Sequence, residues 1–258
     1  MLEALLKGPA AYAPRTGWPA WAVIPAALVI LALAAMAGVL VAWGYSILAG
    51  FGFPQGADTA TLAPQVAAQL TTWTAGFQVG VIVFTLLAAG FFSSERNAAL
   101  ALRPPAQGWR ALPLALVPLF IVTMVWTSLL MLVRPEAVLH DLRPFKELLH
   151  GDTFWLLLLV IGVGAPLSEE LLFRGFMFAG LAKSKLGFIG AAVLSSVLWT
   201  LLHFGYSIFG LIEVLSIGLY FSWLLVRTGS LWVTMFCHGV YNTVMALGLY
   251  FMTLPAVG

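Results

Sequence analysis

Long apolar runs limit how this chain can fold more than any other feature of its sequence. Seven runs approach or exceed the roughly 20 residues that a helix needs to cross a bilayer: 21–49, 73–92, 111–133, 153–181, 187–209, 210–227 and 230–253. Only 9% of the 258 residues are charged, whereas a soluble domain carries about a quarter. The sequence therefore predicts an all-α, polytopic membrane helical bundle of about seven transmembrane helices, or six to eight depending on how the long runs divide.

The remaining segments are short connections. We expect residues 1–20 to form a short cytoplasmic N-terminal segment and 21–253 to form a single transmembrane domain. Two connections are long enough for short surface helices, at 58–72 and 135–150. No internal repeat or soluble appendage stands out.

The distribution of Lys and Arg predicts the orientation, because cytoplasmic loops are enriched in these residues. With the N-terminus inside, the outer loops hold only Arg134, Arg143 and Lys146. The inner segments then hold Lys7, Arg15, Arg96, Arg103, Arg110, Lys183, Lys185 and Arg227. We expect a multi-pass protein with a cytoplasmic N-terminus, and the alanine-rich, compact chain suits the plasma or inner membrane of a bacterium.

Charge and cysteine content exclude several functions. The net charge is only +2 and no basic cluster with interleaved aromatic residues is present, so we expect no nucleic-acid partner. Cys237 is the single cysteine, which excludes an intrachain disulfide and a metal site built from several cysteines.

Two adjacent carboxylates and an arginine interrupt the fourth apolar run, within Ser168–Gly175. Ionisable groups at membrane depth cost several kcal/mol and are kept where function needs them. Glu170 and Arg174 are four residues apart and can pair on one helix face. Glu169 points about 100° away and has no cation at helical spacing. Pro166, just before the motif, predicts a kink or a restart of the helix.

Two further polar pairs lie in later apolar runs: Trp199 with His203, and His238 with Asn242. Each pair is four residues apart, so its side chains share a helix face. Counting from the nearest inner Lys or Arg places Glu169 and both histidines very roughly 16–27 Å deep at 1.5 Å per residue. These depths are compatible with one shared intramembrane centre.

Each polar group also has a purely structural interpretation. Glu170 and Arg174 could be a structural ion pair, His203 a hydrogen-bonded core residue, and His238 with Asn242 an interhelical clasp of modest strength. Glu213 is another intramembrane acid to which no role is assigned.

If the three polar groups converge, their chemistry suits hydrolysis. A buried carboxylate can take a proton from water as a general base, and donors from His238 and Asn242 can stabilise an oxyanion. Glu169, His203 and His238 could instead bind zinc, since two histidines and a glutamate form a catalytic ligand set. The His-Glu-x-x-His helix that usually carries such a set is absent, so no cofactor is firmly predicted and a divalent metal such as zinc stays an alternative.

At these residues the chain resembles the CPBP family of intramembrane proteins, which includes the type II CAAX prenyl endopeptidases and is also called the Abi family. The three motifs, Glu169-Glu170…Arg174, Trp199…His203 and His238…Asn242, occur in the family's order within 150–250, the expected catalytic core. Trp199 stands where phenylalanine is commoner.

The resemblance implies an intramembrane endopeptidase in which Glu169, assisted by His203, activates water. It implies an oxyanion hole from His238 and Asn242, with Glu170 and Arg174 in support. The family has also been described as metal-dependent. The substrate would be a membrane-embedded or lipid-anchored protein or peptide.

Two other functions remain open from the sequence. One is an ion-coupled transporter that uses Glu169, Glu213 and the histidines as a proton relay, although the repeats typical of transporters are not visible. The other is a non-catalytic immunity or scaffold protein of the membrane.

Overall fold

The protein is all-helical in the part of the chain that its structure describes. A computed structural model describes residues 9–50 and 59–255, and the side chains of these except 59–63. The helices are α2 (Ala20–Leu48), α3 (Thr59–Phe92), α4 (Arg96–Ala99), α5 (Ala111–Val133), α6 (Pro135–Leu149), α10 (Gly187–Leu201), α11 (Ile208–Thr228) and α12 (Leu231–Phe251), together with one composite helix. The predicted fold class, a polytopic helical bundle of the membrane, is confirmed.

The composite helix runs from Phe154 to Ala182 and consists of five consecutive pieces. They are α7 (Phe154–Leu159), the π-helix η1 (Val160–Gly164), α8 (Ala165–Glu169), the π-helix η2 (Glu170–Met177) and α9 (Phe178–Ala182). Pro166 lies in the first turn of α8, where its missing N–H leaves the preceding helical ladder incomplete. The predicted irregularity at Pro166 is therefore present, as a π-helical turn rather than a break.

Five of the described helices are long and apolar enough to cross a membrane: Ala20–Leu48, Pro64–Phe92, Ala111–Val133, Phe154–Ala182 and Ile208–Thr228. The other two expected spans differ from these. The run 187–209 is helical only as far as Leu201, which makes α10 a shorter apolar helix of 15 residues. The run 230–253 forms the 21-residue α12, which carries the polar His238 and Asn242.

Of the two predicted surface helices, one is present and the other is part of a longer helix. The helix at 135–150 is present as α6, whose residues are strongly amphipathic. The separate helix at 58–72 is wrong, because residues from Thr59 onward continue without a break into α3. Pro64 lies inside this helix, at its sixth residue.

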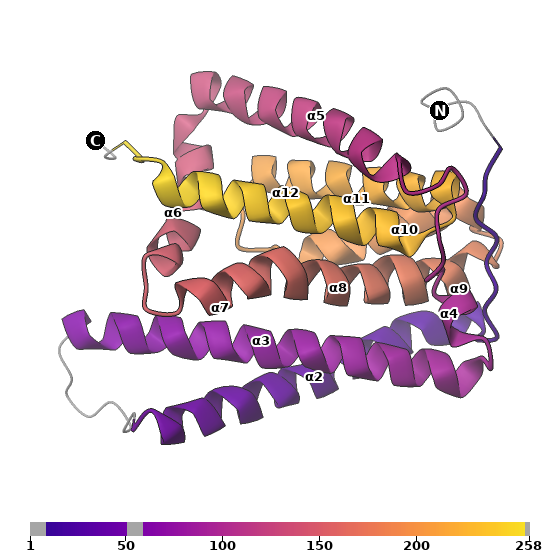
Figure 1. Ribbon diagram of the computed structural model, residues 1–258, viewed down its shortest axis with the longest axis horizontal. Helices are drawn as coiled ribbons and strands as arrows, with labels where there is room; N and C mark the ends of the chain where they lie inside the picture. Colours follow the sequence, from indigo (N-terminus) through magenta and orange to yellow (C-terminus); the bar gives the residue numbers. More distant parts are fainter. Residues whose placement is uncertain (1–8, 51–58, 256–258) are drawn as a thin grey trace.

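Successive long helices alternate in direction, so the ends of the bundle hold different loops (Figure 1). At the end where α2 begins, Arg103 donates to the carbonyl of Gly229 at 2.7 Å and Lys183 donates to that of Thr16 at 2.6 Å. At the opposite end, Lys146 on α6 donates to the carbonyls of Leu249 and Met252 at the end of α12. A cation placed there also complements the α12 dipole.

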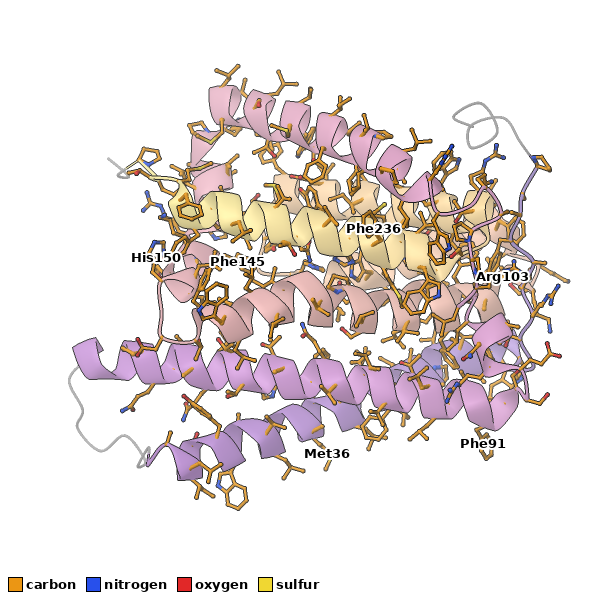
Figure 2. All side chains as sticks on the ribbon, in the orientation of Figure 1. Met36, Phe91, Arg103, Phe145, His150 and Phe236 are labelled. Carbon is orange, nitrogen blue, oxygen red and sulfur yellow. The ribbon has the colours of Figure 1, made fainter. Side chains whose placement is uncertain are left out.

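Apolar side chains cover much of the outer surface of the bundle. Met36 and Phe91 are 63% and 84% exposed, and both point away from the neighbouring helices in Figure 2. Soluble monomers rarely expose such continuous apolar surface. The lipid-facing belt and the five long apolar helices together describe a multi-pass membrane protein.

The composite helix and α12 approach closely through two glycines. A Cβ on Gly239 would lie 2.8 Å from the carbonyl oxygen of Gly162, and one on Gly162 would lie 2.3 Å from Oγ1 of Thr243. Only residues without a Cβ permit this separation of the two backbones. The contact brings the adjacent His238 against the acidic motif.

Candidate functional site

The three polar motifs meet inside the bundle. The acids lie at the junction of α8 and η2, Trp199 lies in the last turn of α10, and His238 lies in the first half of α12. Phe221 of α11 packs against both Trp199 and His238, with ring centroids 6.4 and 5.3 Å away. Residues far apart in sequence therefore share one partly dry site.

Glu170 and Arg174 form the predicted ion pair. Nη1 of Arg174 lies 3.2 Å from Oε1 of Glu170, and both side chains are completely buried. Four residues span almost one turn of a π-helix, so η2 places the two side chains nearly above one another. The pair keeps two opposite charges together where either alone would be costly.

The guanidinium of Arg174 also stacks on aromatic rings. Its central carbon lies 4.3 Å from the ring centroid of Trp199 and 5.8 Å from that of Phe221. Attraction between a cation and a ring face increases when both are desolvated. Arg174 is thus fixed by a carboxylate on one side and by the Trp199 indole on another.

His238 lies between the two acids. Its Nδ1 is 3.1 Å from Oε1 of Glu170, so Nδ1 carries the proton in this hydrogen bond with the carboxylate. Its Nε2 lies 3.9 Å from Oε2 of Glu169. The imidazole therefore connects the buried Glu170 to the more accessible Glu169.

Glu169 differs from its neighbour in access to solvent and in its partners. Its side chain is 22% exposed, against 0% for Glu170. Oε2 accepts a 2.5 Å hydrogen bond from the indole Nε1 of Trp199. Among the described residues, no hydrogen bond reaches its other oxygen, Oε1. Glu169 is the acid of the doublet that a water molecule or a substrate could reach.

His203 lies beside this cluster, two residues after the end of α10 and four after Trp199. Its Nδ1 lies 3.1 Å from the carbonyl oxygen of Trp199. A carbonyl only accepts, so Nδ1 carries the proton and Nε2 keeps its lone pair in the neutral ring. The ring packs edge-on against Trp199 at 5.2 Å between centroids. No direct bond between His203 and Glu169 occurs in the described part of the chain.

Asn242 lies one turn after His238 and is bonded to backbone. Its Nδ2 donates to the carbonyl oxygen of Ile161 in η1 at 3.1 Å. One of its two N–H groups is therefore used to hold the composite helix, and the other is available to a ligand.

Sequence reasoning thus found the members of the cluster but not all their partners. The structure brings together Glu169, Glu170, Arg174 and His238, with His203 and Asn242 at its edge. The hydrogen bond from Trp199 to Glu169 was missed, because the sequence treated that tryptophan as a substitute for phenylalanine. An indole N–H in an apolar helix is the signal that could have found it, since a buried Trp N–H usually has a partner.

Two other predicted features can be placed. Glu213 lies outside the cluster, where its Oε1 accepts a 3.1 Å hydrogen bond from the hydroxyl of Tyr241. Within the described residues, no group of three or more His, Cys, Asp or Glu side chains is arranged to hold a metal ion. The zinc ligand set of Glu169, His203 and His238 stays a prediction.

Comparison with known proteins finds relatives of the C-terminal part of the chain. Residues 151–244 match the family model described as Type II CAAX prenyl endopeptidase Rce1-like. The "UPF0177 protein YxdF" of Lactococcus lactis is 30% identical over 101 residues, which are 37% of this chain and 54% of that protein. The "Putative membrane peptidase YdiL" of Bacillus subtilis is 30% identical over 92 residues, 36% of each chain.

These matches are partial, since the chain spans about half the length of the first relative and about a third of the second. No solved structure matches the chain at comparable significance. The matched segment holds all three polar motifs and both π-helices. The resemblance to the type II CAAX prenyl endopeptidases is therefore confirmed, and it lies in residues 151–244.

Proposed function

We propose that the protein is an intramembrane endopeptidase that hydrolyses a peptide bond of a membrane-embedded or lipid-anchored protein. The observation that carries this proposal is that two adjacent acids differ in burial and in pairing. Glu170 is fully buried and paired with Arg174, whereas Glu169 is 22% exposed and keeps an oxygen available. The matched family supports the same conclusion, because it is a family of endopeptidases.

Glu169 acts as the general base in this proposal. A water bound at its Oε1 gives up a proton to the carboxylate as the oxygen attacks the carbonyl carbon of the substrate. As the tetrahedral intermediate collapses and the C–N bond breaks, the protonated Glu169 gives this proton to the leaving amine. His203 assists by accepting a hydrogen bond from the same water through Nε2. Its Nδ1–H is already used by the carbonyl of Trp199, which fixes the tautomer that this role requires.

His238 and Asn242 stabilise the oxyanion formed by that attack. Asn242 retains one free N–H beside its bond to Ile161. His238 donates from Nε2 when both ring nitrogens carry protons. Two carboxylates, the Arg174 guanidinium and an imidazolium then sum to zero charge, which suits a site of low dielectric. Donors fixed in place before the reaction are worth several kcal/mol in such a site.

Metal-dependent hydrolysis by the same residues is a separate hypothesis. Zinc held by Glu169, His203 and His238 would activate the water directly. Elemental analysis of the purified protein and of His203→Ala and His238→Ala tests this mechanism. Stoichiometric zinc in the wild type that both variants lose would replace the glutamate mechanism with the zinc one.

The experiment that tests the endopeptidase proposal uses purified protein in detergent and a quenched fluorescent peptide that ends in a farnesylated CAAX sequence. We expect cleavage by the wild type and a loss of at least about 10²-fold in kcat in Glu169→Gln, the range typical for a general base. Glu213→Gln is the matched control, because it alters another intramembrane glutamate that lies outside the cluster and is bonded to Tyr241.

A second measurement detects cleavage of substrates other than this peptide. Membrane fractions from cells that express the wild type or Glu169→Gln are compared for newly formed protein N-termini. New termini that depend on Glu169 support an endopeptidase. If neither the peptide nor any membrane protein is cut in a Glu169-dependent way, the proposal is wrong.

The same variants separate the alternatives. A proton-coupled transporter that relays through both acids predicts that Glu213→Gln is as damaging to uptake in proteoliposomes as Glu169→Gln. A non-catalytic immunity or scaffold protein predicts an unchanged cellular phenotype when Glu169, His203, His238 and Asn242 are replaced together. The unmodified form of the CAAX peptide, assayed in parallel, shows whether the prenyl group contributes to recognition.

The protein would carry out this reaction in the cell membrane with its N-terminus in the cytoplasm. The segments that follow α4 and α9, which contain Arg103 and Lys183, lie at one end of the bundle, and α6, which contains Arg143 and Lys146, lies at the other (Figure 1). Lys7, one of the inner cations counted from the sequence, lies outside the described residues.

A further inference from the structure

Trp199 contacts four other residues of the candidate site: Glu169, Arg174, His203 and His238. Its side chain is 3% exposed. Its indole edge donates to Oε2 of Glu169 at 2.5 Å, and its face lies 4.3 Å from the guanidinium carbon of Arg174. Its backbone carbonyl accepts from His203, and its ring packs against His238 at 5.6 Å.

The hydrogen bond to Glu169 is the contact that a phenylalanine could not make. The indole N–H is a donor only, with no acceptor capacity, so it engages the oxygen that carries charge or a lone pair. Glu169 has three rotatable side-chain bonds and is the only partly exposed acid of the doublet. Within the described residues, its other polar contact is with His238, whose Nε2 lies 3.9 Å from Oε2 of Glu169.

The indole in turn cannot move freely. Arg174 stacks on one part of the ring and is itself held by the buried Glu170. Phe221 and His238 pack on the same side chain. The buried Glu170–Arg174 pair therefore holds the Trp199 ring in place. The N–H of that ring in turn holds Glu169.

We propose that Trp199 is a positioning residue that fixes one oxygen of Glu169, so that the other oxygen faces the reacting water. This inference rests on the proposed endopeptidase function and assigns Trp199 no direct contact with the substrate. It also explains how the buried Glu170–Arg174 pair contributes to the site. This pair orients the Trp199 ring, and the ring orients Glu169, the proposed base.

The two parts of the indole can be separated by substitution. Trp199→Phe keeps an aromatic face for Arg174 but removes the N–H donor. Incorporation of benzothienylalanine at position 199 keeps the shape of the bicyclic ring and replaces the N–H with sulfur. Trp223→Phe is the matched control, since Trp223 lies in α11 and stacks on Tyr220 away from the motifs.

The kinetic expectation is a change in kcat without a change in KM. Misplacing a catalytic group by about 1 Å costs about 10²-fold in rate, so Trp199→Phe and the benzothienyl variant should both lose 10- to 100-fold in kcat on the farnesylated peptide. The benzothienyl variant should keep the KM and the melting temperature of the wild type. Trp199→Phe should keep the KM but melt at a lower temperature, because a smaller ring leaves a cavity at this buried site. Trp223→Phe should keep the wild-type kcat and KM. A full rate in the benzothienyl variant would overturn the proposal.

A measurement that needs no activity keeps this inference separate from the proposed function. In a ¹H–¹⁵N correlation spectrum of protein labelled at its ten tryptophans, the indole signal of Trp199 is assigned by its absence in Trp199→Phe. We expect that signal downfield of the other indoles, as for a short hydrogen bond to a carboxylate, and displaced upfield in Glu169→Gln. It should be unmoved in Glu213→Gln. A Trp199 indole signal that does not respond to Glu169→Gln overturns the proposal even if the enzyme is active, whereas the expected response with no Glu169-dependent cleavage overturns the function alone.

Discussion

At the scale of single residues, the site depends on how differently it treats two neighbouring glutamates. The pairing of Glu170 with Arg174 could be predicted from the sequence, because their four-residue spacing is a local property of a helix. The partners of Glu169 could not, since Trp199 is 30 residues away and meets it only after α10 has packed. His203 was expected beside Glu169, and the structure instead bonds it to the Trp199 backbone.

Neutralising Glu170 should mainly lower the stability of the protein, whereas neutralising Glu169 should mainly lower its activity. Glu170→Gln leaves the completely buried Arg174 without its counterion, and removing one member of a buried pair costs about 3–5 kcal/mol. Glu169→Gln removes a charge that is partly exposed, so it should lower stability little while it lowers kcat by at least about 10²-fold. Thermal unfolding of both purified variants in the same detergent measures the difference. Equal melting temperatures would contradict the assignment of Glu170 as the structural member.

At the scale of helices, the composite helix and α12 form the framework of the site. Sequence analysis located the irregularity at Pro166 and the polar face of α12, but it could not show that α10 ends at Leu201. The apolar run continues to 209, and the signals nearest that end, Gly205 and the N-cap Ser207 of α11, come four and six residues after it. The hydrogen bond from Asn242 to the Ile161 carbonyl in η1 could not be predicted either, because the two residues are 81 positions apart in the sequence.

The close approach of these two helices can be tested by adding a single methyl group. In Gly239→Ala the new Cβ would lie 2.8 Å from the backbone oxygen of Gly162, and overpacking of this kind costs about 1–3 kcal/mol. The helices must separate, which moves His238 away from the acids, so both melting temperature and kcat should fall.

Gly248→Ala is the control on the same helix. A Cβ on Gly248 would have no atom within 4 Å, and alanine is favoured over glycine in helices by about 1 kcal/mol. This variant should be as stable as the wild type or slightly more so. If both substitutions behave alike, close packing at Gly239 does not hold His238 in place.

At the scale of the whole molecule, the long apolar runs together with the low charge content were enough to predict a helical membrane bundle. The alternating helix directions agree with the connections predicted between apolar runs (Figure 1). The exact extent of the spans was less predictable, because α10 is short and α12 carries polar residues whose burial depends on neighbours rather than on their own sequence.

The orientation in the membrane can be measured by cysteine labelling. Cys237 is buried, and Cys237→Ala supplies a background without cysteine. Lys185→Cys and Asp152→Cys then introduce one thiol each at exposed positions on opposite ends of the bundle. With a membrane-impermeant maleimide, we expect Asp152→Cys to react in intact cells and Lys185→Cys to react only after permeabilisation. The reverse pattern would place the N-terminus outside.

The π-helical segment η2 carries a consequence for insertions and deletions. A π-helical turn holds one residue more than the turn of an α-helix, so the chain within Glu170–Met177 has a residue to lose without a break in its helix. Loss of one residue between the acids and Arg174 would let the segment relax into an α-helix, while the helix beyond Met177 keeps nearly its present orientation. Arg174 would become the third residue after Glu170, a spacing that still places both side chains on one helix face. In a regular α-helix the same loss would rotate everything that follows by about 100°, so this segment tolerates a change of length better than the α-helical parts of the same span.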